Sequence, residues 1–100
     1  MDERPKGSWE GSPKVIEYMK ENNISSFDEL QDAYMNNIIN ILKDSKKITA
    51  AWNEAALPPH NDIGSSGSAG KIDKSCVIFA WEHPDVGLMS VRKGFQTILC

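Results

Sequence analysis

The first half of the chain carries apolar residues at helical spacing. Ser12 and Pro13 supply an N-cap and a first-turn proline, and the helix that they begin is predicted to end at Asn22-Asn23. A second helix begins with the capping-box pattern Ser26-Phe27-Asp28-Glu29 and runs to about Asp44. Its apolar side is expected to contain Leu30, Tyr34, Ile38, Ile41 and Leu42.

The second half carries short apolar runs, which are typical of buried strands. The runs are Ile48-Thr49-Ala50-Ala51-Trp52, Cys76-Val77-Ile78-Phe79-Ala80-Trp81 and Phe95-Gln96-Thr97-Ile98-Leu99-Cys100. The middle run is the clearest, and we expect it to be covered on both faces. Between the second and third strands, a helix over residues 85–93 is predicted, with Leu88 and Val91 inward and Gly94 as its C′ residue.

Strands that alternate with helices indicate an α/β fold with a parallel sheet and right-handed crossovers. The segment 53–74 has no periodicity, and we expect it to form a long flexible loop. Its low-complexity patch, residues 64–70, does not fit a phosphate-binding loop, because Ser65 stands where a glycine is required and Ile72 where Ser or Thr is required. We interpret the patch as flexible surface.

Composition and charge exclude several classes of function. The 100 residues suffice for one small core, whereas a complete large-barrel enzyme typically needs about 250. The 11 basic and 14 acidic residues are spread along the chain, so no basic stripe is available for nucleic acid or an anionic membrane. Acidic residues follow Met1, and no apolar run is long, so we expect neither a signal peptide nor a transmembrane helix in this sequence.

Cysteine and histidine spacing gives no indication of a metal site. Cys76 and Cys100 lack CxxC or histidine-ligand spacing, and we interpret them as small apolar strand residues with free thiols rather than as disulfide or metal partners. His60 and His83 lie beside prolines and have no ligand partner at helical spacing, so we expect them to be loop residues. No metal or other cofactor is expected.

Four motifs follow one another along the chain. They are Asp2-Glu3-x-Pro5-x-Gly7-x-Trp9-Glu10-x-Ser12-Pro13, Trp52-Asn53-Glu54-Ala55, Val77-x-x-Ala80-Trp81 and Lys93-Gly94-Phe95-x-x-Ile98-Leu99. In order and spacing they resemble the family 20 glycoside hydrolases, the β-N-acetylhexosaminidases, and especially their bacterial chitobiase-like branch. The sequence lacks the family's His-x-Gly-Gly lead before the acidic pair and its Tyr-x-Asp after the last strand.

The resemblance implies a partial (β/α)8 TIM barrel, from the end of strand 4 through strand 7. On this mapping Asp2 and Glu3 end strand 4, Trp52 ends strand 5, Trp81 ends strand 6, and residues 95–100 form strand 7. Active sites of such barrels lie at the carboxyl ends of the strands, where these residues would meet. Residues 1–100 would then be a fragment of one catalytic domain, with segment 53–74 as a loop within it.

The resemblance also implies a retaining, exo-acting β-N-acetylhexosaminidase. Such an enzyme releases terminal N-acetylglucosamine or N-acetylgalactosamine from an oligosaccharide or glycoconjugate, and the substrate's own acetamido oxygen is the nucleophile. Glu3 would be the general acid and base, and Asp2 would orient the acetamido nitrogen and stabilise the oxazolinium charge. Trp52 and Trp81 would form walls of the sugar site, and Glu54 would support its rim.

Other interpretations of the same residues stay open. The two tryptophans could be ordinary core residues and the acidic pair a solvated one. The whole protein could be a non-catalytic sugar-binding relative or a free-standing small α/β interaction domain. If the chain is a barrel fragment, its open sheet edges lead us to expect that it is inactive alone and self-associates. The resemblance admits a periplasmic, secreted or lysosomal location.

Overall fold

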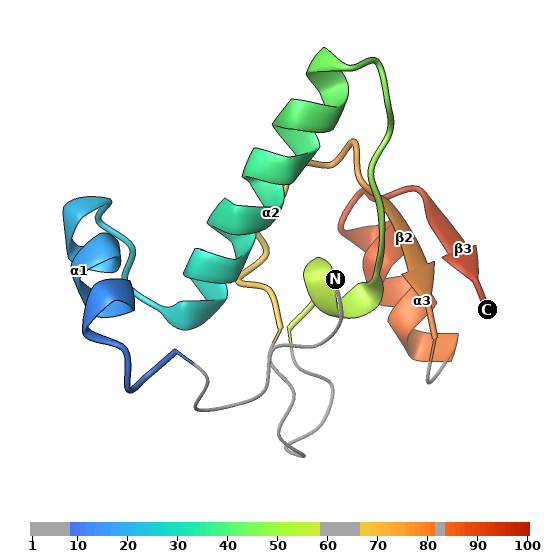
Figure 1. Cartoon of the computed structure of the whole chain (residues 1–100). Helices are drawn as coiled ribbons and strands as arrows, with labels where there is room; N and C mark the ends of the chain where they lie inside the picture. Colours follow the sequence, from blue (N-terminus) through green and yellow to red (C-terminus); the bar gives the residue numbers. More distant parts are fainter. Residues whose placement is uncertain (1–8, 59–66, 82–83) are drawn as a thin grey trace.

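The computed structural model describes residues 9–58, 67–81 and 84–100. Figure 1 shows how its helices and strands are arranged. Two α-helices come first, followed by three strands, one short 3-10 helix and one further α-helix. In order they are α1 (Pro13–Glu21), α2 (Phe27–Asp44), β1 (Ala50–Trp52), the 3-10 helix η1 (Asn53–Ala55), β2 (Val77–Ala80), α3 (Pro84–Arg92) and β3 (Thr97–Leu99).

The strands form one parallel sheet in the order β1-β2-β3. Trp52 of β1 is the register partner of Phe79 of β2, which is in turn the partner of Ile98 of β3. The predicted α/β fold with a parallel sheet is therefore confirmed. Each strand is two or three residues shorter than the apolar run that predicted it, because residues at the ends of the runs lie outside the strand bounds.

Both helices that pack on the sheet lie on the same face. Ile78 and Ala80 of β2 are buried; Ile78 belongs to a core cluster with Met35 and Ile39 of α2, and Ala80 to a second cluster with Val86 of α3. Neighbouring strand residues point to opposite faces, so Val77 and Phe79 face the other way, and both are only partly buried. The expectation that β2 is covered on both faces is wrong within the described residues.

Helix α2 begins as predicted but buries a different side. The Ser26 hydroxyl accepts a hydrogen bond from the Glu29 N–H at 3.1 Å, and the Glu29 carboxylate accepts from the N–H of Ser25 rather than that of Ser26. Its buried residues are Leu30, Gln31, Asp32, Met35 and Ile39. Tyr34 and Ile41 are exposed, contrary to prediction, because the packed side contains polar groups with distant hydrogen-bond partners.

Helix α3 also packs through residues other than the predicted ones. Leu88 and Val91 are exposed, whereas Val86, Gly87 and Ser90 are buried. A Cβ atom at Gly87 would overlap the Leu99 side chain, so a larger residue there would require this exposed side chain to move. The buried face of α3 thus combines Val86 with the small residues Gly87 and Ser90, which a pattern of large apolar residues does not mark. Gly94, at φ +93°, ends the helix as predicted.

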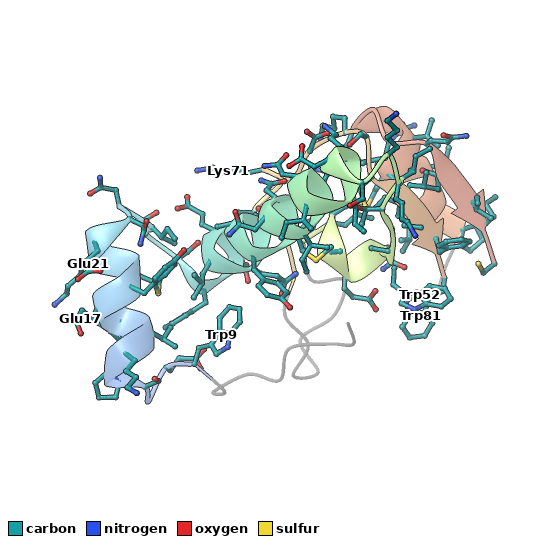
Figure 2. All side chains as sticks on the ribbon, turned by 45° about the horizontal axis from the view of Figure 1, so that its top comes forward. Trp9, Glu17, Glu21, Trp52, Lys71 and Trp81 are labelled. Atoms are coloured by element: carbon teal, nitrogen blue, oxygen red, sulfur yellow. The ribbon has the colours of Figure 1, made fainter. Side chains whose placement is uncertain are left out.

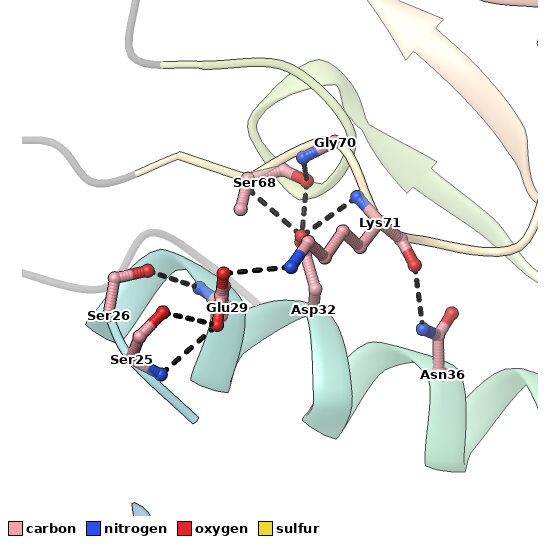
Figure 3. Close-up of polar contacts among 9 residues, drawn as sticks. Ser25, Ser26, Glu29, Asp32, Asn36, Ser68, Gly70 and Lys71 are labelled. Atoms are coloured by element: carbon pink, nitrogen blue, oxygen red, sulfur yellow. Dashed lines mark hydrogen bonds and ion pairs between the residues drawn. The ribbon is translucent and has the colours of Figure 1, made fainter. Parts of the chain in front are cut away.

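A cluster of polar side chains on α2 fixes the segment that leads into β2, and we call it the α2 clamp (Figure 3). The Asp32 carboxylate, 1% exposed, accepts hydrogen bonds from the Ser68 hydroxyl and from the N–H groups of Ala69 and Lys71, each N–H at 3.0 Å. Asn36, one turn further along, donates to the Lys71 carbonyl at 2.9 Å and accepts from the Asp73 N–H at 2.8 Å. The clamp therefore satisfies the backbone of an irregular segment with side chains from one helix.

The clamp changes the interpretation of the glycine-rich patch. Gly67 and Ser68 are buried, so this end of the patch is not on the surface as expected. The Ser68 N–H also donates to the Leu57 carbonyl at 2.8 Å, which closes the base of the segment between them. Apart from η1, the described residues of segment 53–74 form no helix or strand, in agreement with its lack of periodicity.

We expect the folded protein to lose stability in acid because of an ion pair at the start of α2. Lys71 lies 2.8 Å from Glu29 and, together with the hydrogen bonds from Ser25, lowers the pKa of Glu29 from 4.5 to about 2. A carboxyl group with a lowered folded-state pKa stabilises the fold above the unfolded pKa and stops doing so as the pH falls through the folded one. Unfolding midpoints should therefore decrease between pH 4.5 and about 2, and Glu29→Gln should reduce that decrease. Equal slopes for both proteins in urea titrations would contradict the assignment.

The two cysteines lie just outside the strands in which they were predicted. Cys76 precedes β2 and is buried, and Cys100 follows β3 and is exposed; neither is in a disulfide. Burial, together with the nearby charge of Asp73, raises the pKa of the Cys76 thiol. In the described part of the chain, no helix combines the length and the apolar character needed to cross a membrane.

Candidate active-site edge

Two tryptophans mark the carboxyl edge of the sheet. Trp52 is the last residue of β1, and Trp81 directly follows the last residue of β2. Since the strands are parallel, both side chains leave the sheet at the same edge, as the labelled residues in Figure 2 show. Trp52 is 50% exposed and Trp81 41%, so neither is an ordinary core residue in this structure. The structure therefore brings together the two predicted aromatic residues.

Trp52 stands on the sheet face opposite the helices. Its ring lies 5.8 Å from that of Phe79, its register partner, with the ring planes tilted by 58°. Aromatic rings favour such tilted contacts at this separation. Ile98 continues the row on β3 and is exposed. These three side chains thus form an apolar row across the sheet face that points away from the helices. We call the carboxyl edge that carries Trp52 and Trp81 the tryptophan edge.

Trp81 is bound to the turn that follows Trp52. Its backbone N–H donates to Asn53 Oδ1 at 3.0 Å, and its indole Nε1–H donates to Glu54 Oε1 at 2.8 Å. Asn53 is 3% exposed. The two hydrogen bonds connect residues 28 and 27 positions apart in the sequence, so the ends of β1 and β2 are held together by side chains as well as by the ladder.

Helix α2 holds the turn that contains Asn53 and Glu54. Gln31, 4% exposed, donates from Nε2 to the Glu54 carbonyl at 3.0 Å, and the Asn53 carbonyl accepts from the N–H groups of Ala56 and Leu57. Sequence patterns did not identify Asn53 or Gln31 as part of the site. An Asn directly after an apolar run does suggest a turn residue, but nothing local indicates its partner on the next strand.

The predicted catalytic pair, Asp2 and Glu3, is outside the described residues. So are His60 and His83, which were expected to be loop residues. Among residues 9–58, 67–81 and 84–100, no three His, Cys, Asp or Glu side chains cluster as metal ligands. A surface hollow of about 400 Å³ lies beside the start of α1, lined by residues 10–13 with Ile16, Glu17 and Lys20, and includes neither tryptophan. The tryptophan edge is the better candidate because it combines exposed aromatic rings with hydrogen-bonded support.

A parallel sheet with helices on one face is the arrangement of a segment of a (β/α)8 barrel, whose helices form an outer ring. The family model described as "Glycosyl hydrolase family 20, catalytic domain" matches residues 1–100, and the chain belongs to this family. The resemblance found in the sequence motifs is thereby confirmed.

Individual relatives agree with this membership. β-Hexosaminidase subunit B2 of Dictyostelium discoideum is 29% identical over 97 residues, which are 97% of this chain and 16% of that protein. Two crystal structures of the family 20 exo-β-N-acetylglucosaminidase from Vibrio harveyi, an inactive variant and a complex with N-acetylglucosamine, align with TM-scores of 0.77 and 0.78 at 26% and 28% identity. Each alignment covers 98% of this chain and 14% of the Vibrio protein. The chain therefore spans a small part of these relatives.

Proposed function

We propose that this chain is part of a retaining, exo-acting β-N-acetylhexosaminidase that hydrolyses terminal N-acetylglucosamine or N-acetylgalactosamine residues. The observation that carries the proposal is the meeting of Trp52 and Trp81 at the carboxyl edge of a parallel sheet, in a chain of this family. Exposed aromatic rings offer apolar faces to a sugar ring and to an acetamido methyl group. The Vibrio harveyi relative, whose complex contains N-acetylglucosamine, supports this class of ligand.

In this proposal the described strands are strands 5, 6 and 7 of the barrel, and Asp2 and Glu3 end strand 4. Trp52 and Trp81 are substrate-binding walls, and Glu54 supports them from the turn after β1. Glu3 protonates the leaving oxygen and then activates water, and Asp2 orients the acetamido group that attacks the anomeric carbon. The chemistry needs no metal or organic cofactor, because the nucleophile belongs to the substrate.

Paired substrates test the proposal on the whole protein that contains this sequence. It should hydrolyse 4-nitrophenyl N-acetyl-β-D-glucosaminide, whereas 4-nitrophenyl β-D-glucoside, which lacks the acetamido group, should react at least about a hundredfold more slowly because it has lost the nucleophile. Comparable rates on the two would overturn acetamido participation, and no turnover of either would overturn the enzyme assignment in favour of a sugar-binding relative.

The same assay extends to the isolated 100-residue polypeptide. We expect no turnover, because catalysis requires preorganised groups from the whole barrel and this polypeptide would supply only part of the site. Its unpaired sheet edges should also cause self-association, which light scattering would detect. Turnover by a monomer of the polypeptide would contradict the proposal that these residues form part of a larger site.

A further inference from the structure

The Glu54 carboxylate has one side-chain partner in the described part of the chain, and that partner is Trp81. Oxygen Oε1 accepts from the indole Nε1–H at 2.8 Å. Oxygen Oε2 is buried and has no hydrogen-bond partner among the described residues. A carboxylate acceptor gives a shorter and stronger hydrogen bond than a neutral one does. The Glu54 carboxylate is thus enclosed at one oxygen and makes a charge-assisted hydrogen bond to the indole with the other.

The backbone of Glu54 is held independently of that contact. Gln31 binds its carbonyl at 3.0 Å, and the preceding residue, Asn53, is buried and binds the backbone N–H of Trp81. The carboxylate thus stands on a turn that is fixed to both α2 and the end of β2. A rigidly mounted acceptor can determine where a neighbouring ring lies.

Within the described residues the Trp81 indole has one hydrogen bond, to Glu54, and 41% of the residue is exposed. A tryptophan side chain has two rotatable torsions, and packing fixes them only where the ring is enclosed. For a half-exposed ring, a hydrogen bond from Nε1–H restricts rotation about both torsions. Loss of the acceptor would leave the ring free to adopt other rotamers at the same backbone position.

We propose that Glu54 is a positioning residue, which holds the Trp81 indole in the orientation that the sugar site requires. The inference rests on the proposed function and deepens it: Glu54 acts through Trp81 and not by contact with the sugar. Asn53 fixes the backbone of Trp81, and Glu54 fixes its ring.

Kinetics of the whole protein with 4-nitrophenyl N-acetyl-β-D-glucosaminide test this role. Glu54→Met keeps the side-chain length but removes the acceptor, and should lower kcat/KM about tenfold, mainly through KM, because a mispositioned wall weakens sugar binding. Glu54→Gln retains an oxygen that can accept from the indole and should stay within about threefold of wild type. The matched control is Glu21→Met on α1, an exposed glutamate that lies far from Trp52 and Trp81 in Figure 2 and whose change should leave the kinetics indistinguishable from wild type.

A double-mutant cycle separates positioning from general stability. In a Trp81→Phe background, which lacks the indole donor, Glu54→Met should cause little further loss. A full tenfold loss in that background, or a Glu54→Gln variant as impaired as Glu54→Met, would overturn the proposal. Coupling between the two positions, with unchanged thermal unfolding of the single variants, would support it.

The indole resonance of Trp81 provides a readout that does not depend on activity. In protein labelled with 15N-tryptophan, the Trp81 signal is assigned from its disappearance in Trp81→Phe, and its N–H should exchange with water at least tenfold more slowly than an exposed indole. Fast exchange in wild type would overturn the contact without any need for the Glu54→Met variant to fold. If the wild-type protein hydrolyses no N-acetylglucosaminide, the proposed function fails, and slow exchange still supports the Glu54–Trp81 contact.

Discussion

Glu3→Gln, made in the whole protein, should lower kcat/KM by about 10²- to 10⁴-fold on substrates with poor leaving groups. The amide cannot donate the proton that an unactivated glycosidic oxygen needs as it departs. An aryl leaving group of low pKa departs without full protonation, so its rate should decrease much less. Rates of a series of aryl N-acetylglucosaminides, plotted against leaving-group pKa, should therefore have a steeper slope for Glu3→Gln than for wild type.

Asp2→Asn is the matched comparison, because it changes the neighbouring carboxylate in the same way. If Asp2 serves the acetamido group, the variant should be slow on every substrate that reacts through that group. Its plot should then run nearly parallel to that of wild type, only lower. Equal slopes for the two variants, or a wild-type rate from either, would refute the separate roles and favour a solvated acidic pair.

Asp32→Leu should destabilise the protein by roughly 3 kcal/mol, as the central carboxylate of the α2 clamp is lost. The substitution removes the acceptor of the buried Ser68 hydroxyl and of the Ala69 and Lys71 N–H groups, and a buried donor without a partner costs about 1–3 kcal/mol. Water can reach the two backbone groups more easily than the hydroxyl, so the total lies below the sum of three full penalties. Urea unfolding would measure the loss.

Two further variants test whether the lost hydrogen bonds cause the destabilisation by Asp32→Leu. Asp32→Asn keeps one oxygen acceptor and should be less destabilising than Asp32→Leu. Asp44→Leu, at the exposed end of the same helix, should change stability by no more than about 0.5 kcal/mol. Leu has a higher helix propensity than Asp, so propensity cannot cause a loss in either variant. A loss for Asp44→Leu comparable to that for Asp32→Leu would refute the clamp as the cause.

Sequence patterns predicted the helix ends because the signals there are local. Ser12 and Ser26 cap helices within a few residues of themselves, and Gly94 takes up a positive φ where α3 ends. The buried faces were harder, since tertiary contacts decide them. An aspartate within a helix is usually exposed to solvent. Asp32 is buried instead, because its hydrogen-bond partners lie 36 to 39 positions further along the chain.

The candidate site also has parts that the sequence predicted and parts that depend on tertiary contacts. Trp52 and Trp81 were identified through motif resemblance, and the parallel register explains why they share an edge. The support beneath them could not be read from the sequence, because the hydrogen bonds of Gln31 and Asn53 cross between separate elements. A residue that positions another leaves no periodic or compositional signal of its own.

The hydrogen bond between Ser68 and Leu57 has a consequence for variation among homologous chains. It closes the segment between these residues at its base, and the α2 clamp holds the chain beyond it on the way to β2. Changes in the number of residues between these two anchors should therefore leave the β1–β2 pairing undisturbed, because closing a loop of twice the length costs only about 0.6 kcal/mol more. Evolution, or an engineer, could then vary the length of the chain between Leu57 and Ser68 while the scaffold stays the same.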